Sequence, residues 1–135
     1  MSRIDTRESV VFFVYQYDFR REDIERQIEL FVEDKEELGE DIDYFTSTVK
    51  GIIDRRDELD KSISALLKNW TIDRIPKLDK AILETAMYEI SYNDDIPTSV
   101  AINEAVRLAK KYGTDDSSSY INGVLSSYEK AQEDD

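Results

Sequence analysis

The chain of 135 residues carries 31 acidic and 18 basic side chains, which gives a formal net charge of −13. It is long enough to bury the core of one domain, and its apolar runs fall short of the roughly 18 residues that a membrane-spanning helix needs. Cysteine and histidine are absent from the sequence, which excludes disulfides, the common zinc sites and catalysis by either side chain.

The glycines and carboxylates argue against the remaining enzyme classes. The four glycines stand far apart, so no glycine-rich loop can cradle a phosphate. Carboxylates are so numerous that any pair of them carries little information. We therefore expect a protein that is not an enzyme and uses no cofactor or metal. The N-terminal region contains Asp5 and Glu8 and lacks a small-residue cleavage site, so we expect a cytoplasmic protein without a secretory signal or membrane partner.

The first predicted helix starts near Thr6. Asp5 stands three residues before Glu8, which is the spacing of a capping box. Apolar residues then recur at helical intervals: Val10, Phe13, Val14 and Tyr17. The run VVFFVY has the β-branched and aromatic composition of a strand, so propensity alone leaves a strand open at this point.

A short helix and a long one are predicted next. The short helix follows an apolar stripe over residues 24–31, and Gly39 is its expected stop. The long helix runs from about Ile42 to Trp70 and would extend about 40 Å if unbroken. We expect it to form the spine of the molecule, with Trp70 filling the core at its end.

Three further helices complete the predicted architecture. Pro76 and Pro97 each mark a helix start, and apolar residues at helical spacing follow both. A last helix is expected to place Ile121 and Leu125 on its apolar face, and we expect the acidic tail over residues 130–135 to fray. The sequence therefore predicts an all-α bundle of about six to seven helices in a single domain over residues 1–135.

The segment between the last two helices has two interpretations. As structure, Lys110 and Lys111 suit the negative end of a helix, and Gly113 suits a left-handed residue that ends it. Asp115 or Asp116 could then cap the next helix. This interpretation needs no ligand.

The second interpretation is a binding site for single-stranded RNA. Tyr112, Ser119 and Tyr120 gather near the two lysines, and bases stack on rings while phosphates bind cations and hydroxyls. The net charge of −13 repels a polyanion at long range, so such a site must be local.

Four other residues also allow a structural and a functional interpretation. Gly51 and Gly123 interrupt helical patterns, and we expect close approach of a neighbouring helix at both rather than backbone exposed to a ligand. Asp79 and Lys80 follow Pro76, where a carboxylate suits the start of a helix, so they need no partner.

Three blocks of the C-terminal half occur together in a characteristic order: LDKAILETAMYEI (78–90), IPTSVAINEAVRLAKKYG (96–113) and SSSYINGVL (117–125). With this order and spacing they resemble the NusB family of transcription antitermination factors. The segments TRESVVFFVYQYDF and VKGIIDRRDELDKSI extend the resemblance, more loosely, over nearly the whole chain.

The resemblance implies an all-helical fold of two three-helix halves and a non-enzymatic role in antitermination on ribosomal RNA operons. It implies two direct partners, the boxA element of nascent RNA and NusE, a small-subunit ribosomal protein. The two proteins together would bind boxA more tightly than this chain alone. They would hold the RNA near the elongating polymerase, within a complex that includes other Nus factors.

The resemblance also implies positions for the two binding surfaces. The RNA surface comprises Arg3, Arg7, Tyr15, Tyr112, Asp116 and Tyr120. To these the chemistry of the segment adds Lys110, Lys111 and Ser119. Asp79, with its neighbour Lys80, falls at the acidic contact to NusE. Family members often start with a dense arginine cluster, whereas this chain has only Arg3 and Arg7, so NusE would supply part of the positive surface.

Two alternative functions are weighed against this one. The same fold serves as the RNA-binding module of ribosomal RNA cytosine methyltransferases, although the chain ends at Asp135 with no catalytic domain after it. A helical module that binds only proteins would use the segment around Gly113 purely as structure. Titration with boxA RNA, with and without NusE, separates these functions.

Overall fold

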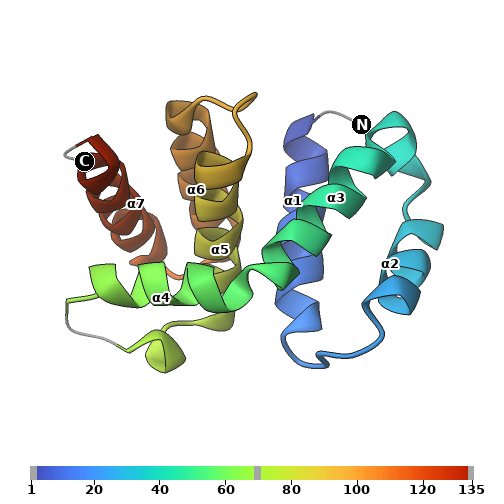
Figure 1. Ribbon diagram of the computed structural model, residues 1–135, viewed down its shortest axis with the longest axis horizontal. Helices are drawn as coiled ribbons and strands as arrows, with labels where there is room; N and C mark the ends of the chain where they lie inside the picture. The colour runs from blue at the N-terminus through green and yellow to red at the C-terminus, as the bar shows by residue number, and fades with distance from the viewer. Residues whose placement is uncertain (1–2, 69–70, 134–135) are drawn as a thin grey trace.

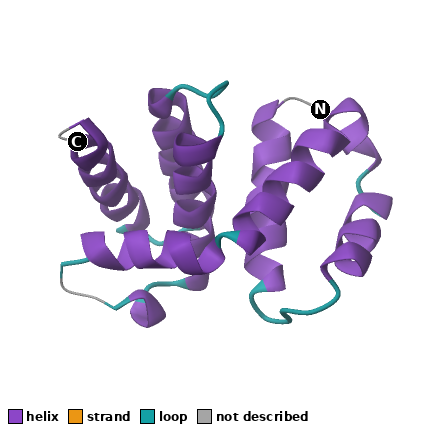
Figure 2. Cartoon of the chain, in the orientation of Figure 1, coloured by secondary structure: helices purple, strands orange, loops and turns teal. Residues whose placement is uncertain are grey.

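The computed structural model describes residues 3–68 and 71–133, except for the side chains of residues 36 and 37. Over these ranges it contains seven α-helices and two 3₁₀ helices and no strand, which confirms the all-α prediction (Figures 1 and 2). The elements in order are α1 (Arg3–Tyr17), α2 (Ile24–Glu33), η1 (Glu36–Asp41), α3 (Ile42–Asp54), α4 (Arg56–Leu66), η2 (Ile72–Arg74), α5 (Lys77–Tyr92), α6 (Thr98–Tyr112) and α7 (Ser117–Glu133).

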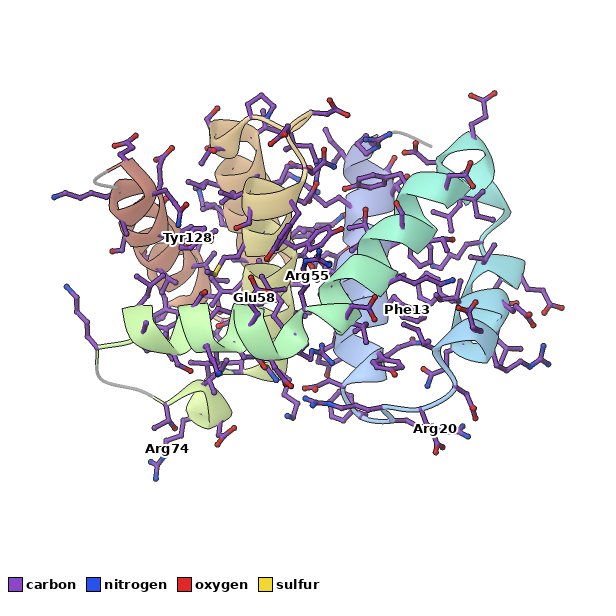
Figure 3. The ribbon with its side chains drawn as sticks, viewed as in Figure 1. Phe13, Arg20, Arg55, Glu58, Arg74 and Tyr128 are labelled. Carbon is purple, nitrogen blue, oxygen red and sulfur yellow. The ribbon has the colours of Figure 1, made fainter. Side chains whose placement is uncertain are left out.

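The first helix contains the run VVFFVY, so burial overrides its strand propensity. Phe13 is fully buried and packs edge-on against Phe31 of α2 and Phe45 of α3, with ring centroids 5.6 and 5.8 Å apart (Figure 3). Such aromatic contacts add to the free energy of burial. The helix is already formed at Arg3, the first described residue, and so starts earlier than the predicted Thr6.

The helices form two groups that meet along α1 and α5. Helices α1, α2 and α3 lie on one side of the molecule, and α4, α5, α6 and α7 lie on the other (Figure 1). Helix α1 packs against both α3 and α5, and so it joins the two groups. The resemblance implied three helices in each half, and the second half has a fourth because the predicted spine is divided.

The predicted long helix is wrong, because the chain turns at Arg55. The backbone of Arg55 (φ −105°, ψ 12°) lies between α3 and α4, which run in different directions (Figures 1 and 3). The turn lets α3 pack on α1 while α4 packs on α5 and α7. It also buries Arg56, whose guanidinium donates to Glu84 at 3.0 and 3.1 Å and to the backbone oxygen of Val14 at 3.2 Å. Trp70, expected to fill the core, lies outside the described residues.

Gly51 and Gly39 have environments that explain why glycine stands at these positions. A Cβ atom on Gly51 would lie 2.1 Å from the hydroxyl oxygen of Tyr88, so the predicted close approach of a neighbouring helix, α5, is confirmed. Helix α2 ends at Glu33, before the predicted stop at Gly39. Gly39 instead lies within η1 with a φ of +43°, a conformation that favours glycine.

The remaining helices begin where the prolines predicted. Helices α5 and α6 start directly after Pro76 and Pro97. Helix α7 continues to Glu133, so residues 130–133 of the tail expected to fray are helical. Within the described ranges, no helix has the length and apolar character needed to cross a membrane.

A buried carboxylate joins the two groups of helices. Asp18 follows the end of α1, and its side chain is almost fully buried. Its oxygens lie 3.5 Å from Arg56 of α4, 3.3 Å from Lys77 and 3.8 Å from Lys80, both of α5, and Arg21 also pairs with it. We call these five residues the Asp18 cluster.

Candidate nucleic-acid interface

The outer side of α1 and the turn that follows it carry a row of aromatic rings that continues onto α6. Tyr15 packs edge-on against Phe19, and Phe12 packs edge-on against Tyr112 of α6, with ring centroids 5.1 and 4.9 Å apart. Phe12 and Tyr15 also line one open hollow between α1 and α2, with a volume of about 670 Å³. We call Phe12, Tyr15, Phe19 and Tyr112 the aromatic face. Phe19 is 62% exposed, so part of this face is open to a ligand that stacks.

Tyr15 and Tyr112 belong to the predicted RNA surface, whereas Phe12 and Phe19 were not predicted. The spacing of Phe12, Tyr15 and Phe19, at i, i+3 and i+7, is that of one side of a helix, and Phe19 keeps this side although it lies in the turn after α1. That signal was present in the sequence. It was masked because the neighbouring Phe13 belongs to the opposite, buried side.

Cations at the end of α6 lie beside the aromatic face. The ammonium of Lys111 lies 5.1 Å from the centroid of the Tyr112 ring and 3.3 Å from a carboxylate oxygen of Glu8. Arg107 lies 3.6 Å from the same carboxylate, and the hydroxyl of Tyr112 donates to it. Lys110 is exposed, and no ion pair holds it within the described structure. Arg107 also pairs with Glu104, at 2.9 Å, so two carboxylates face these three cations. The excess of cations is small, and it leaves a local positive region on an acidic protein.

The two N-terminal arginines have different environments. Arg7 is only 5% exposed and donates to Glu89 of α5 at 2.7 Å and to Glu104 of α6 at 3.1 Å. Two buried carboxylates thus hold its charge inside the protein, and its contact with RNA stays a prediction. Arg3 stays at the surface, where its guanidinium lies 3.9 Å from the centroid of the Tyr44 ring. It also pairs with the carboxylate of Asp41, in η1, at 3.1 Å.

Hydrogen bonds to the hydroxyl of Ser117 stabilise the junction between α6 and α7. The backbone N–H of Thr114 donates to the hydroxyl oxygen of Ser117 at 2.9 Å. Neither Asp115 nor Asp116 caps the helix through its side chain in the described structure, contrary to the prediction. Gly113 is extended rather than left-handed (φ −89°, ψ −169°), but a Cβ atom there would lie 2.7 Å from a carbonyl oxygen of α6.

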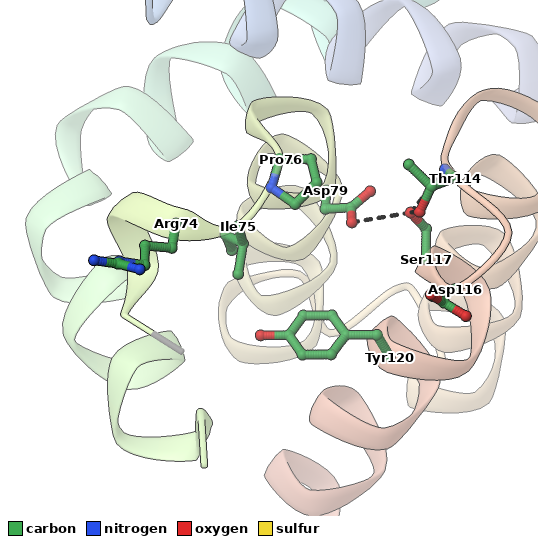
Figure 4. A pocket seen from close by; sticks show the side chains of 8 residues that line it. All are labelled: Arg74, Ile75, Pro76, Asp79, Thr114, Asp116, Ser117 and Tyr120. Carbon is green, nitrogen blue, oxygen red and sulfur yellow. Dashed lines mark hydrogen bonds between the residues drawn. The ribbon is translucent and has the colours of Figure 1, made fainter. Parts of the chain in front are cut away.

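A pocket of about 210 Å³ opens between the start of α5 and this junction (Figure 4). It is lined by Arg74, Ile75, Pro76, Asp79, Thr114, Asp116, Ser117 and Tyr120. The carboxylate of Asp79 accepts a hydrogen bond of 3.0 Å from the hydroxyl of Ser117. Asp116 and Tyr120, predicted to contact RNA, thus share a pocket with Asp79, predicted to contact NusE.

Two polar atoms of this pocket lack partners. The Oδ1 atom of Asp79 and the hydroxyl oxygen of Tyr120 are both buried and form no hydrogen bond within the protein. Burial raises the pKa of Asp79, and the hydrogen bond from Ser117 offsets part of that rise. Burial and the nearby Asp79 carboxylate raise the pKa of Tyr120. Two side chains that line the pocket therefore each keep one buried polar atom unpaired.

Neither residue predicted to contact NusE is exposed. Asp79 is 3% exposed, so a partner can reach it only through the pocket. Lys80 is also buried, and its ammonium lies 3.6 Å from Asp60 and 3.8 Å from Asp18. The charge of Lys80 thus compensates these two carboxylates, and its contact with NusE stays a prediction.

Ser119 is exposed on α7, beside a further hollow. This hollow, of about 350 Å³, lies between the end of α4 and α7, and Ser119, Tyr120 and Gly123 all line it. A Cβ atom on Gly123 would have no neighbour within 4 Å, so the close approach predicted there is wrong. Tyr120 thus separates two hollows on one side of α7.

A sequence model of the NusB family matches residues 4–130. The chain belongs to the NusB family. Among relatives, the transcription antitermination protein NusB of Thermoanaerobacter sp. (strain X514) is 44% identical over 128 residues, covering 95% of this chain and 90% of that protein. The protein of the same name from Acetivibrio thermocellus is 41% identical over 125 residues, covering 93% and 86% of the two chains.

Solved NusB structures share the fold. A NusB structure from T. maritima superposes with a TM-score of 0.83 at 31% identity, covering 93% of this chain and 89% of that chain. The NusB in a complex of antitermination factors NusB and NusE with double-stranded RNA superposes with a TM-score of 0.85 at 25% identity, covering 97% and 99%. The resemblance inferred from the three C-terminal blocks is confirmed.

Proposed function

We propose that this chain is a non-enzymatic, RNA-binding transcription antitermination factor that binds the boxA element of ribosomal RNA operons together with NusE. It acts in the cytoplasm, within an antitermination complex with RNA polymerase and other Nus factors. Support comes from membership of the NusB family and from the name of its relatives. It also comes from the solved complex in which a NusB of the same fold is found with NusE and RNA.

The observation that carries the RNA proposal is the aromatic face beside the cations of α6. Tyr112 belongs to both, since its ring packs on Phe12 and lies under the ammonium of Lys111. Unpaired bases stack on exposed rings, and neighbouring cations bind the phosphates between them. This combination favours single-stranded RNA over a purely protein ligand.

The charge of the whole chain explains why a second protein would be needed. A formal net charge of −13 opposes the approach of a phosphate backbone, and only local cations act against it. Glu8 further offsets Arg107 and Lys111. A basic partner such as a ribosomal protein would extend the positive region, while this chain provides the stacking rings.

Fluorescence anisotropy with labelled boxA RNA tests the proposal. The chain alone should bind weakly, and saturating NusE should tighten binding by about tenfold or more, a coupling of at least about 1.4 kcal/mol. A scrambled RNA of the same composition is the matched control and should not gain affinity from NusE.

Two results would contradict the proposal. NusE could bind this chain while neither this chain alone nor its complex with NusE prefers boxA over the scrambled RNA. The chain would then be a protein-binding module. If boxA binds equally well without NusE, the RNA-binding part survives and the role of NusE fails.

A further inference from the structure

Three donors on the last turns of α6 converge on one carboxylate of α1. The ammonium of Lys111 lies 3.3 Å from the carboxylate of Glu8, and the guanidinium of Arg107 lies 3.6 Å from it. The hydroxyl of Tyr112 donates a hydrogen bond to the same carboxylate. Lysine, arginine and tyrosine are among the side chains with which proteins bind the phosphate oxygens of nucleic acids. Glu8 therefore occupies a position that suits a phosphate of an RNA backbone.

Glu8 also lies in line with the rings of the aromatic face. Glu8, Phe12 and Tyr15 stand at i, i+4 and i+7 of α1, so they share one side of that helix. The ring of Phe12 packs on Tyr112, whose hydroxyl contacts Glu8. Every stacked base is joined through its sugar to a phosphate, so RNA on these rings brings a phosphate close to the three donors.

The fold does not need the contacts of Glu8 to join α1 to α6. Arg7 of α1 already pairs with Glu104 of α6 at 3.1 Å, and both side chains are buried. The side chain of Lys111, by contrast, is 54% exposed, and an ion pair at such a surface contributes little to stability. A structural role alone thus leaves the convergence of three donors on Glu8 unexplained.

Lys111 is the cation whose charge depends most on Glu8. Arg107 has a second carboxylate partner, Glu104, at 2.9 Å. Within the part of the chain that the structure describes, Lys111 forms an ion pair with Glu8 and with no other carboxylate. Removal of the Glu8 charge therefore leaves the positive charge of Lys111 without a counter-ion, whereas Arg107 stays paired.

We propose that Glu8 competes with RNA phosphate for Lys111 and thereby limits the RNA affinity of this chain. The inference rests on the RNA binding proposed above and deepens it. When a phosphate approaches, either the ion pair between Glu8 and Lys111 opens, or the phosphate and the carboxylate share the ammonium. Opening loses the ion pair, and sharing brings two anions close together, so both cost free energy. The cost applies to RNA of any sequence, because phosphate contacts carry no sequence information.

Glu8→Gln tests the proposal, because glutamine removes the charge and keeps an oxygen that can accept a hydrogen bond from Tyr112. Fluorescence anisotropy compares parent and variant on labelled boxA RNA and on the scrambled RNA, for the isolated chain and with saturating NusE. The variant should bind both RNAs about fivefold more tightly at about 0.1 M salt, equivalent to about 1 kcal/mol for one exposed ion pair. The gain should shrink as added salt screens the charges.

Two further variants separate this local effect from a change in net charge. Glu58→Gln removes the same charge at a matched site, since Glu58 accepts a hydrogen bond from the hydroxyl of Tyr92, and Arg55 lies 4.3 Å from the centroid of that ring. Glu58 lies outside the aromatic face, so Glu58→Gln should bind RNA like the parent. In a Lys111→Ala background the cation is absent, so Glu8→Gln should lose most of its gain. Circular dichroism confirms that each variant is folded.

The outcomes keep this inference distinct from the proposed function. If Glu8→Gln binds both RNAs no more tightly than the parent, Glu8 does not compete with phosphate, and a preference for boxA with NusE still supports the proposed function. An equal gain for Glu58→Gln, or a gain that persists in the Lys111→Ala background, also overturns the inference. If Glu8→Gln shows the expected gain but neither parent nor variant prefers boxA with NusE, the competition is confirmed and the boxA function fails.

Discussion

Tyr112 is the residue at which the two components of the proposed RNA surface meet. Replacing it with alanine should lower boxA affinity by about 1–3 kcal/mol, because one stacking platform is lost. Tyr92→Ala is the matched control, since Tyr92 is 40% exposed and Tyr112 38%, and Tyr92 lies outside the aromatic face. Anisotropy titrations with NusE present should show the loss only for Tyr112→Ala. Equal losses for both variants would refute a specific stacking role.

Lys111 should act through charge rather than through stacking. If its ammonium pairs with one phosphate, Lys111→Ala should flatten the slope of log affinity against log salt by up to about one unit. Lys130→Ala is the control, because Lys130 is exposed on α7 about 20 Å from the start of that helix at 1.5 Å per residue. Tyr112→Ala, by contrast, should shift the salt line without changing its slope. A parent-like slope for Lys111→Ala would remove this lysine from the surface.

For single helices, substitution by alanine should change the free energy of unfolding in opposite directions at two glycines. Gly51→Ala should lower the free energy of unfolding by about 1–3 kcal/mol, because the new methyl group overlaps the ring of Tyr88. Gly123→Ala should raise it by up to about 1 kcal/mol, because its surroundings are open and alanine favours a helix. Urea denaturation measures both.

A third variant isolates the cause of the loss at Gly51. In a Tyr88→Ala background the overlap is absent, so Gly51→Ala should become neutral or stabilising. If Gly51→Ala costs the same with and without Tyr88, close packing of α3 against α5 is not its origin.

Local pattern predicted most helices but missed the break at Arg55. Ile52 and Leu59 are seven residues apart, which keeps one apolar stripe continuous across the break. Neither proline nor glycine stands at that position, so no local signal ends the helix. The turn results from tertiary packing, because α3 and α4 contact different groups of helices. A single-sequence pattern cannot show such a cause.

The sequence likewise predicted only part of the candidate site. Residue chemistry selected Tyr112, whose ring packs on Phe12, Lys111, which lies over that ring, and Tyr120, which lines the pocket. It did not show that Arg7 and Asp79 are buried, because both charges depend on partners more than 35 positions away in the sequence, Glu89 for Arg7 and Ser117 for Asp79. Long-range pairing of charged and polar side chains is the information that the pattern lacks.

At the scale of the whole molecule, the Asp18 cluster predicts how stability responds to acid. Burial alone would raise the pKa of Asp18, but Arg21, Lys80, Arg56 and Lys77 lower it to about 2. Because the folded pKa lies below the unfolded value of about 3.9, the stabilisation is complete above about pH 4 and is lost as the pH falls toward 2. The loss should reach about 2 kcal/mol.

Asp18→Asn tests that prediction. The variant should be less stable than the parent at pH 7, and its stability should fall less steeply between pH 4 and 2, as measured by urea denaturation at each pH. Asp115→Asn, a change at an exposed carboxylate, should follow the parent curve. An Asp18→Asn curve parallel to the parent curve would show that the cluster does not link the two groups of helices electrostatically.

The proposed arrangement of the whole complex is tested most directly by mapping where RNA contacts the chain. BoxA RNA carrying 4-thiouridine, bound with NusE and irradiated, forms crosslinks that mass spectrometry assigns to residues. We predict crosslinks at the aromatic face, above all Tyr15 and Tyr112, and at Tyr120 beside the pocket. Crosslinks confined to other surfaces, such as the far end of α7, would show that this acidic protein does not bind RNA through the rings of α1 and the α6–α7 junction.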